Sequence, residues 1–515
     1  MKALLGMHAR TGRTALAGWP LAWAAMVVAV AASTMSLHST AADRARYAAT
    51  VGMSRVQEAF NGRAWDVDTP GGIASFEIGF AGLLLIPIGA FLMAVGRTRK
   101  EESQGRWDIV TAGSFTRTAP VASAGIAASA AVAVFFALAA VGLAGLGLPL
   151  RGSIAYAGVL ACLALFFAWL GLLVAQIVSE PSTATTVGLV GILCCFVVRA
   201  VVDVRHSGAT WLTPMGWMGQ ARPWSDVRWW PYVAFALSTA LVAALSLRLA
   251  ALRDLGSGLL PARPGPAFAS RYLSSVDGWV WRVVRGNVAG WKIGGIVLAS
   301  VMGSFAREVT RTFEDNPSLM SLLEDFAPED FLTVFVMLIL ALMAMAAGLS
   351  VWSHHRAEEV SGRLGRVAAG VVRPSRLWDS WMLCSVASAA IVMTAGIVFY
   401  CTCLFLAVSD ARVGSAAQFG LVLLVAVVFL VCLGGLLVAR FPRWWPLAWV
   451  AFAWIAAEAM LVGGLDLPEW LRDTSPLHAV GQLDDPQWTV VGALVLASGA
   501  LVGVGHASKR DLLAG

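Results

Sequence analysis

Long apolar segments recur along the whole chain, and nearly all of them reach the ~20 residues that a helix needs to cross about 30 Å of hydrocarbon. With 58% hydrophobic and only 13% charged residues, the chain has too little charge to cover the surface of a water-soluble globule. The sequence therefore predicts an all-α integral membrane protein with about twelve transmembrane helices. The segments lie near residues 17–37, 75–95, 118–146, 154–178, 184–204, 230–250, 290–305, 330–352, 380–408, 416–439, 444–464 and 487–506.

An acidic element occurs twice, each time after the second apolar segment of one half of the chain. Glu101-Glu102-Ser103-Gln104-Gly105-Arg106 returns 257 residues later as Glu358-Glu359-Val360-Ser361-Gly362-Arg363. Arg253-Asp254-Leu255 returns as Arg510-Asp511-Leu512 at the same offset. These pairs predict a tandem duplication: a six-helix half over residues 1–255, a cytoplasmic linker with an amphipathic helix over 256–288, and a second six-helix half over 289–515.

Arginine and lysine are concentrated in the short loops after the second and eighth apolar segments and in the linker. Because positive charge marks the cytoplasmic side, we expect these loops and both termini to face the cytoplasm. Residues 38–74 and 306–329 then lie outside, where their spacing predicts short helices. The linker stretch from 269 to 288 is amphipathic and is expected to lie along the inner surface.

Several kinds of chemistry are excluded or disfavoured. The four lysines, at positions 2, 100, 292 and 509, stand in no G-x-x-x-x-G-K-[ST] motif, so the chain does not bind ATP in that way. The basic residues that give the net charge of +6 lie in loops beside apolar segments, which argues against nucleic-acid binding. Cys401-Thr402-Cys403 lacks nearby histidines and is interpreted as membrane packing. We predict no catalytic and no metal site.

Arg199 and Glu458 lie in the fifth apolar segments of the two halves, at corresponding positions. A charge within hydrocarbon is costly unless it is paired or beside water, so each residue is a candidate for the substrate pathway. Two alternatives remain: an ion pair that only fastens the halves together, or Arg199 reaching outward with Asp203.

The chain resembles the permease subunits of ATP-binding-cassette exporters of the polyketide-antibiotic type. The resemblance rests on six spans per half, the acidic loop after the second span, the linker Arg253-Asp254-Leu255-Gly256-Ser257-Gly258-Leu259-Leu260-Pro261 and the external segment from Trp211 to Trp217. It implies an ABCG-like (type V) arrangement in a bacterial plasma membrane. It also implies export of hydrophobic or amphipathic compounds such as antibiotics, drugs or lipids, and hence multidrug resistance.

In such exporters a separate nucleotide-binding ATPase subunit binds twice beneath the permease, so ATP and magnesium would be held by that partner and no cofactor by this chain. The resemblance implies that the duplicated loops carry the coupling to the ATPase. The residues concerned are Glu101, Glu102, Gly105, Arg106, Glu358, Glu359, Gly362 and Arg363. Two alternatives stay open: a proton-driven transporter with Glu458 as the proton carrier, and a membrane scaffold that does not transport.

Overall fold

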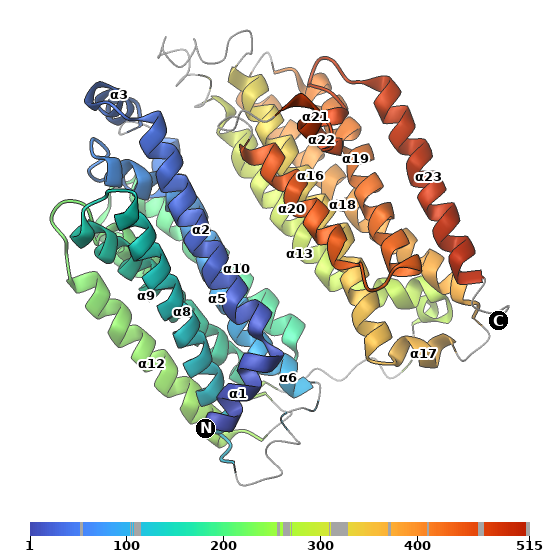
Figure 1. Ribbon diagram of the computed structural model, residues 1–515, viewed down its shortest axis with the longest axis horizontal. Coiled ribbons are helices and arrows are strands. Elements are labelled where there is room, and N and C mark those ends of the chain that lie inside the picture. The colour runs from blue at the N-terminus through green and yellow to red at the C-terminus, as the bar shows by residue number, and fades with distance from the viewer. Residues whose placement is uncertain are drawn as a thin grey trace. The chain divides into compact units, whose positions relative to one another are not determined.

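Each of the twelve predicted apolar segments forms a helix in the computed structural model (Figure 1). The structure describes residues 1–51, 55–103, 105, 107, 115–254, 258–260, 268, 270–307, 310, 328–368, 372–408, 411–461 and 468–510. Regular structure among these residues is helical, apart from two isolated β-bridges. The twelve span helices are α2 (Arg13–Leu37), α5 (Pro70–Arg97), α8 (Ala119–Gly145), α9 (Leu150–Ile177), α10 (Pro181–Val204), α12 (Trp230–Leu252), α13 (Val276–Ser304), α16 (Pro328–Val360), α18 (Pro374–Ala407), α19 (Val413–Arg440), α20 (Pro446–Leu461) and α23 (Trp488–Arg510).

Ten of the helices in the described ranges are long and apolar enough to cross a bilayer. The two others among the twelve are α20, a shorter apolar helix of 16 residues, and α13, whose first half carries Arg282 and Arg285. The protein is therefore an all-α integral membrane protein, as the sequence predicts. Shorter helices complete the chain: α1 (Lys2–Thr11), α3 (Ala41–Val51), α4 (Arg55–Asn61), α6 (Arg99–Ser103), η1 (Gly208–Leu212), α11 (Pro214–Gly219), η2 (Arg271–Ser274), α17 (Arg363–Ala368), α21 (Glu469–Arg472) and α22 (Pro476–Ala479).

The chain divides into two compact units, Met1–Gly265 and Pro266–Gly515. This division falls within the predicted linker, while the predicted boundaries of the halves stay a prediction. One detail differs from the expectation. α13 runs without a break from Val276 to Ser304, so the amphipathic stretch before residue 288 is the first part of the seventh span helix and not a separate surface helix. Its N-cap is Ser275, whose hydroxyl accepts a hydrogen bond from the Gly278 amide at 3.1 Å.

The core of the first unit lies along α5, which packs against α9, α2 and α10. Small residues permit the close approach, as is typical in membranes. Gly188 of α10 lies against the ring of Phe91, where an added Cβ would come within 2.0 Å of the ring carbon Cζ. α3 and α4 occupy residues 41–51 and 55–61, within the segment where external helices are expected. Most of the corresponding segment 306–329 lies outside the described residues.

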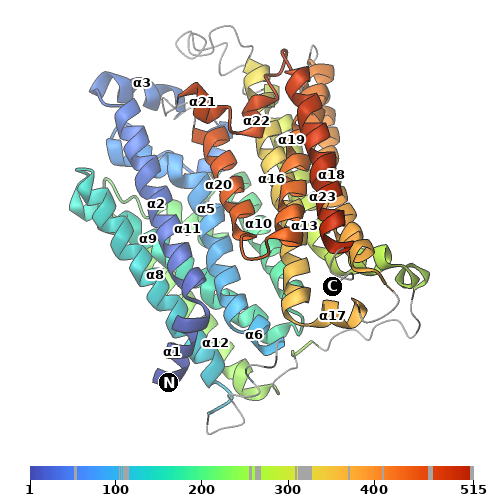
Figure 2. The same ribbon diagram turned by 45° about the vertical axis from the view of Figure 1, so that its right-hand side comes forward.

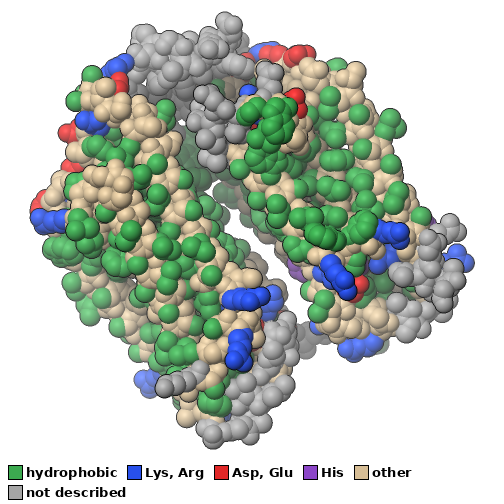
Figure 3. All heavy atoms as spheres, in the orientation of Figure 1, with side chains coloured by type: hydrophobic (Ala, Val, Ile, Leu, Met, Phe, Trp, Pro, Cys, Tyr) green, Lys and Arg blue, Asp and Glu red, His purple; other side chains and the backbone are tan. Residues whose placement is uncertain are grey.

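In the second unit α16, α18 and α19 pack against one another (Figure 2). Hydrogen bonds link these helices through the apolar interior: Ser385 donates to the carbonyl of Gly348 at 2.7 Å, and the Trp352 indole donates to that of Val431 at 3.2 Å. Hydrophobic side chains cover the visible flanks of each unit, and Lys and Arg side chains gather around α17 at one end of the second unit (Figure 3). This pattern fits helices whose flanks face lipid and whose ends meet water.

Candidate functional site

The first copy of the acidic element begins at the end of α5, at a turn that we call the elbow. α5 ends at Arg97 and α6 begins at Arg99, and Thr98 between them keeps φ and ψ in the right-handed helical region, at −114° and −77°. The Thr98 hydroxyl donates to the carbonyl of Ala94 at 3.1 Å, and the Thr98 carbonyl accepts from the Glu102 amide at 2.9 Å. The elbow places Glu102 and Arg99 beside the ends of α12 and α9.

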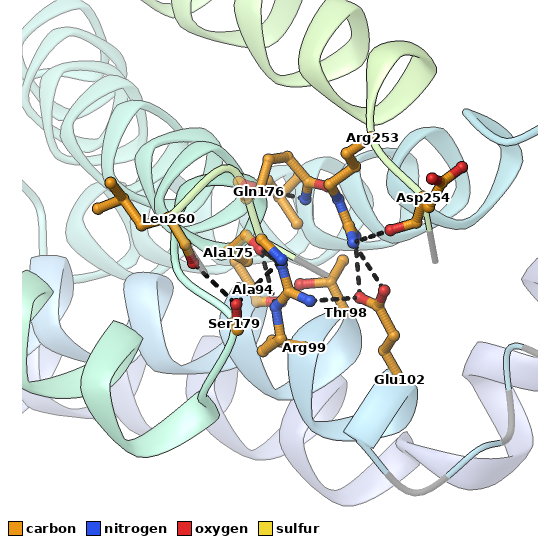
Figure 4. Close-up of polar contacts among 12 residues, drawn as sticks. Ala94, Thr98, Arg99, Glu102, Ala175, Gln176, Ser179, Arg253, Asp254 and Leu260 are labelled. Atoms are coloured by element: carbon orange, nitrogen blue, oxygen red, sulfur yellow. Dashed lines mark hydrogen bonds and ion pairs between the residues drawn. The ribbon is translucent and has the colours of Figure 1, made fainter. Parts of the chain in front are cut away.

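A buried ion pair joins this elbow to the end of α12 (Figure 4). The Arg253 guanidinium donates to both carboxylate oxygens of Glu102, at 2.7 and 2.8 Å. The side chains are only 7% and 4% exposed. Two parallel hydrogen bonds between planar charged groups hold distance and orientation together, so this contact fixes the elbow against α12.

Arg99 and Gln176 extend the ion pair to the end of α9. Arg99 lies 3.1 Å from the second carboxylate oxygen of Glu102 and donates through Nε to the carbonyl of Ala175 at 2.9 Å. Gln176 accepts from Nε of Arg253 at 2.6 Å. One carboxylate thus faces two guanidinium groups, and three helix ends meet at this point. We name Arg99, Glu102, Gln176 and Arg253 the elbow cluster.

The start of the linker is tied to the same place. Leu260 pairs with Val178 in a short parallel bridge, and its amide donates to the carbonyl of Ile177 at 2.9 Å. Ser179 donates to the Leu260 carbonyl at 2.9 Å and accepts from the Gly258 amide at 3.0 Å. The described part of the linker, residues 258–260, therefore follows the end of α9 closely (Figure 4).

The second copy of the element repeats the local geometry. Gly105 and Gly362 both have a left-handed backbone, with φ of 71° and 72°, and each amide donates to the carbonyl three residues earlier. Arg356 pairs with Glu359 as Arg99 pairs with Glu102. A side chain at either glycine would strain this turn. The acidic element therefore recurs in local backbone structure as well as in sequence.

The two copies differ in their surroundings. Arg363 holds both carboxylate oxygens of Glu358 at 2.7 Å, but its side chain is 57% exposed. Glu359 is also half-exposed, whereas Glu102 is buried. α16 continues straight through Glu358 and Glu359 to Val360, without the break found at Thr98.

Of the predicted coupling residues, Arg106 lies outside the described residues. Glu101 is partly buried beside Glu102 in α6. Sequence reasoning identified Glu102 but missed the contacts of the three other members of the elbow cluster. Two of these carried a signal, because Arg99 and Arg253 also recur 257 residues later, as Arg356 and Arg510. Gln176 carried none.

Arg199 is buried in α10 and makes its contacts within the first unit. It lies 3.5 Å from Asp203 one turn later and donates to the carbonyls of Glu58 and Phe60 at 3.3 and 2.9 Å. These carbonyls belong to the last turn of α4, where the Glu58 carbonyl also accepts from the Gly62 amide at 2.9 Å. A place of Arg199 in the substrate pathway and the two alternatives to it stay predictions.

Glu458 is buried in α20, with 4% of its surface exposed. Its carboxylate lies 3.8 Å from Nδ1 of His478, and the other ring nitrogen lies 3.8 Å from the exposed Asp473. Among the described residues, no group of three His, Cys, Asp or Glu side chains could hold a metal ion. The clusters found are suited to holding helix ends in place.

This chain is similar to an efflux permease. Residues 273–510 match the family described as "Multidrug efflux system permease Rv1217c, C-terminal domain". The chain is also 26% identical over 527 residues to the "Multidrug efflux system permease protein Rv1217c" of Mycobacterium tuberculosis (strain ATCC 25618 / H37Rv). That alignment covers 98% of this chain and 94% of the relative, so the similarity extends through both units.

Proposed function

We propose that this protein is a membrane permease that exports hydrophobic or amphipathic small molecules such as drugs, antibiotics or lipids. The similarity to an efflux permease over 98% of the chain carries the proposal. The fold supports it, because ten apolar helices in the described ranges are long enough to cross a bilayer. The protein then acts as a transport subunit and not as an enzyme.

We further propose that export is driven by a separate ATP-binding-cassette ATPase of the polyketide-antibiotic exporter type. Two copies of this subunit would bind at the two duplicated elements, and ATP and Mg²⁺ would be bound by them. The support is that the element recurs with the same left-handed turn at Gly105 and Gly362. In this arrangement both termini face the cytoplasm.

The elbow cluster suits the transmission of force. A push on α6 acts on Glu102, which is held by Arg253 at the end of α12 and by Arg99 against the end of α9. Since the three helix ends are fastened by buried charge-assisted hydrogen bonds, they move together and not one at a time. ATP-driven closure of the partner would thereby become a rigid movement of one bundle, as alternating access requires.

The second copy offers the cleaner test, because Arg363 is 57% exposed and its pair with the 14% exposed Glu358 is more open to solvent than the elbow cluster, so its loss costs about 1 kcal/mol or less. The Arg363→Glu variant, reconstituted with its ATPase, should lose most drug-stimulated ATP hydrolysis and transport while its unfolding temperature stays unchanged. Arg443→Glu is the matched control, since Arg443 is exposed in the loop between α19 and α20. Wild-type transport and ATP hydrolysis in Arg363→Glu would refute the coupling assignment.

Glu458 supports a second candidate, a proton-driven transporter. A carboxylate buried in an apolar helix beside His478 resembles the proton carriers of secondary transporters. Inactivation of the partner ATPase distinguishes the two candidate functions. ATP-driven export stops, whereas proton-driven export continues and is lost in Glu458→Gln.

A further inference from the structure

A groove of about 570 Å³ lies in the second unit between the first turn of α18, the start of α13 and the last turns of α23. Basic side chains line one wall of the groove, and charged side chains that pair with each other line the other wall. Arg373, Ser375 and Arg376 come from the start of α18, and His506 comes from α23. The duplicated acidic elements contribute no residue to this groove.

The carboxylates in and beside the groove are already paired. Asp277, which follows the lining residue Val276, accepts from Ser380 at 2.6 Å and pairs with Arg376. Asp379 pairs with His506 at 2.8 Å. No carboxylate in the described ranges pairs with Arg373, which therefore gives the groove a surplus positive charge.

Donors without described acceptors lie at the same place. α18 is 34 residues long and begins with Pro374, and its N-cap residue Arg373 makes no side-chain cap. The amides of Ser375 and Arg376 have no acceptor among the described residues. Ser375 is 7% exposed and lines the groove, yet its hydroxyl donates to no described residue. Amides of a long helix's first turn, a buried hydroxyl and a guanidinium together favour an anion with several oxygens.

The groove also lies where lipid headgroups would lie. α18 and α23 are apolar span helices, and the groove is at their ends. η2 leads into α13, whose residue Val276 lines the groove, and Tyr272 of η2 is 81% exposed beside Arg271. Exposed aromatic rings next to arginine are typical of the membrane interface.

We propose that this groove binds the phosphate of an anionic phospholipid, with Arg373, Ser375 and the first amides of α18 as its donors. The lipid would hold the start of α13 against α18 and α23, because Val276 of α13 forms part of the lining. The proposal depends on the membrane location of the protein and not on its energy source.

Native mass spectrometry of the full-length protein released from nanodiscs tests this. Wild type should retain phosphatidylglycerol in preference to phosphatidylcholine, and Arg373→Gln should bind phosphatidylglycerol about fivefold more weakly, as the loss of one interfacial cation predicts. Arg373→Lys should keep most of the binding, and Ser375→Ala should weaken it. Arg443→Gln, which removes an exposed arginine outside the groove, should bind like wild type.

Three results would overturn the proposal. Equal losses in Arg443→Gln and Arg373→Gln would show diffuse attraction and no defined site. Binding of inorganic phosphate that depends on Arg373, with no preference for phosphatidylglycerol, would identify a soluble anion as the ligand. Unchanged lipid binding in Arg373→Gln, with weaker association of the ATPase subunit, would make the groove a protein interface. Unfolding temperatures of all variants exclude misfolding as the cause.

Discussion

The elbow cluster predicts an unequal response to the loss of its charges. Glu102 is one carboxylate between two guanidinium groups, at 2.7 Å from Arg253 and 3.1 Å from Arg99. Arg253→Gln leaves the pair of Arg99 and Glu102 in place. Glu102→Gln instead leaves two buried cations facing an amide. We therefore expect Glu102→Gln to destabilise the protein more than Arg253→Gln does.

The geometry sets the magnitudes. Removing one partner of a buried pair costs about 3–5 kcal/mol, and this range applies to Glu102→Gln because both of its partners are buried. Arg253→Gln loses two charge-assisted hydrogen bonds to Glu102 and one to Gln176 but leaves the ion pair of Arg99 and Glu102, so we expect about 1.5–3 kcal/mol. Arg117 and Asp254, 3.0 Å apart near the same helix end, are 60% and 80% exposed. Arg117→Gln is therefore a control with a loss below about 1 kcal/mol.

A double-mutant cycle over Glu102 and Arg253 measures the pair directly, with unfolding followed in mixed micelles by tryptophan fluorescence. We expect a coupling free energy above 1 kcal/mol and a double variant less destabilised than the sum of the single ones. A coupling below about 0.5 kcal/mol would refute the reasoning. So would a larger loss in Arg253→Gln than in Glu102→Gln.

Three further predictions concern topology, pH and Arg199. In a variant without native cysteines, Arg151→Cys should react with an impermeant thiol reagent from outside and Arg363→Cys should not; the reverse pattern would overturn the orientation. Burial lowers the pKa of His8 to about 4 from an ordinary value of 6.5. The contribution of the neutral His8 to the free energy of unfolding is therefore complete above pH 6.5 and falls by about 2 kcal/mol at pH 5. Unfolding scans of His8→Asn should not show this loss. Arg199→Met should cost about 3 kcal/mol in chemical unfolding, and adding Asp203→Asn should recover little of it, because Asp203 still pairs with Arg63 at 3.4 Å; full recovery would refute this account.

The span helices could be predicted from the sequence because crossing a bilayer imposes a length and a composition on each segment. α13 departs from the prediction for a related reason. Arg282 and Arg285 interrupt its apolar pattern, which suggested a surface helix followed by a short span, yet the backbone continues as one helix. The amino-acid composition of a segment indicates which part of it contacts lipid. A helix can continue beyond the membrane, so its end need not coincide with the end of its apolar part.

The partners of Glu102 could not be predicted with the same ease. The 257-residue offset marks Arg253 and Glu102 as repeated residues, but contact between them depends on where α12 ends relative to the elbow at Thr98. Gln176 is not repeated, and its contact with Arg253 depends on where α9 ends. For Arg199, hydropathy predicts a costly charge, whereas the acceptors that satisfy it are backbone carbonyls of α4, which no side-chain pattern shows.

The two copies of the acidic element connect to their bundles in different ways. In the first unit α5 and α6 are separate helices on either side of Thr98, so in the proposed coupling a load on α6 would reach the bundle through the side chains of the elbow cluster. In the second unit α16 is continuous through Glu359, and a load there would pass along one helical rod of 33 residues. A rod needs no lateral ion pair to transmit force, and the Arg363 side chain of that copy is 57% exposed. The turn at Gly105 and Gly362 is thus common to both copies, while the connection behind it is a buried ion pair in one unit and a continuous helix in the other.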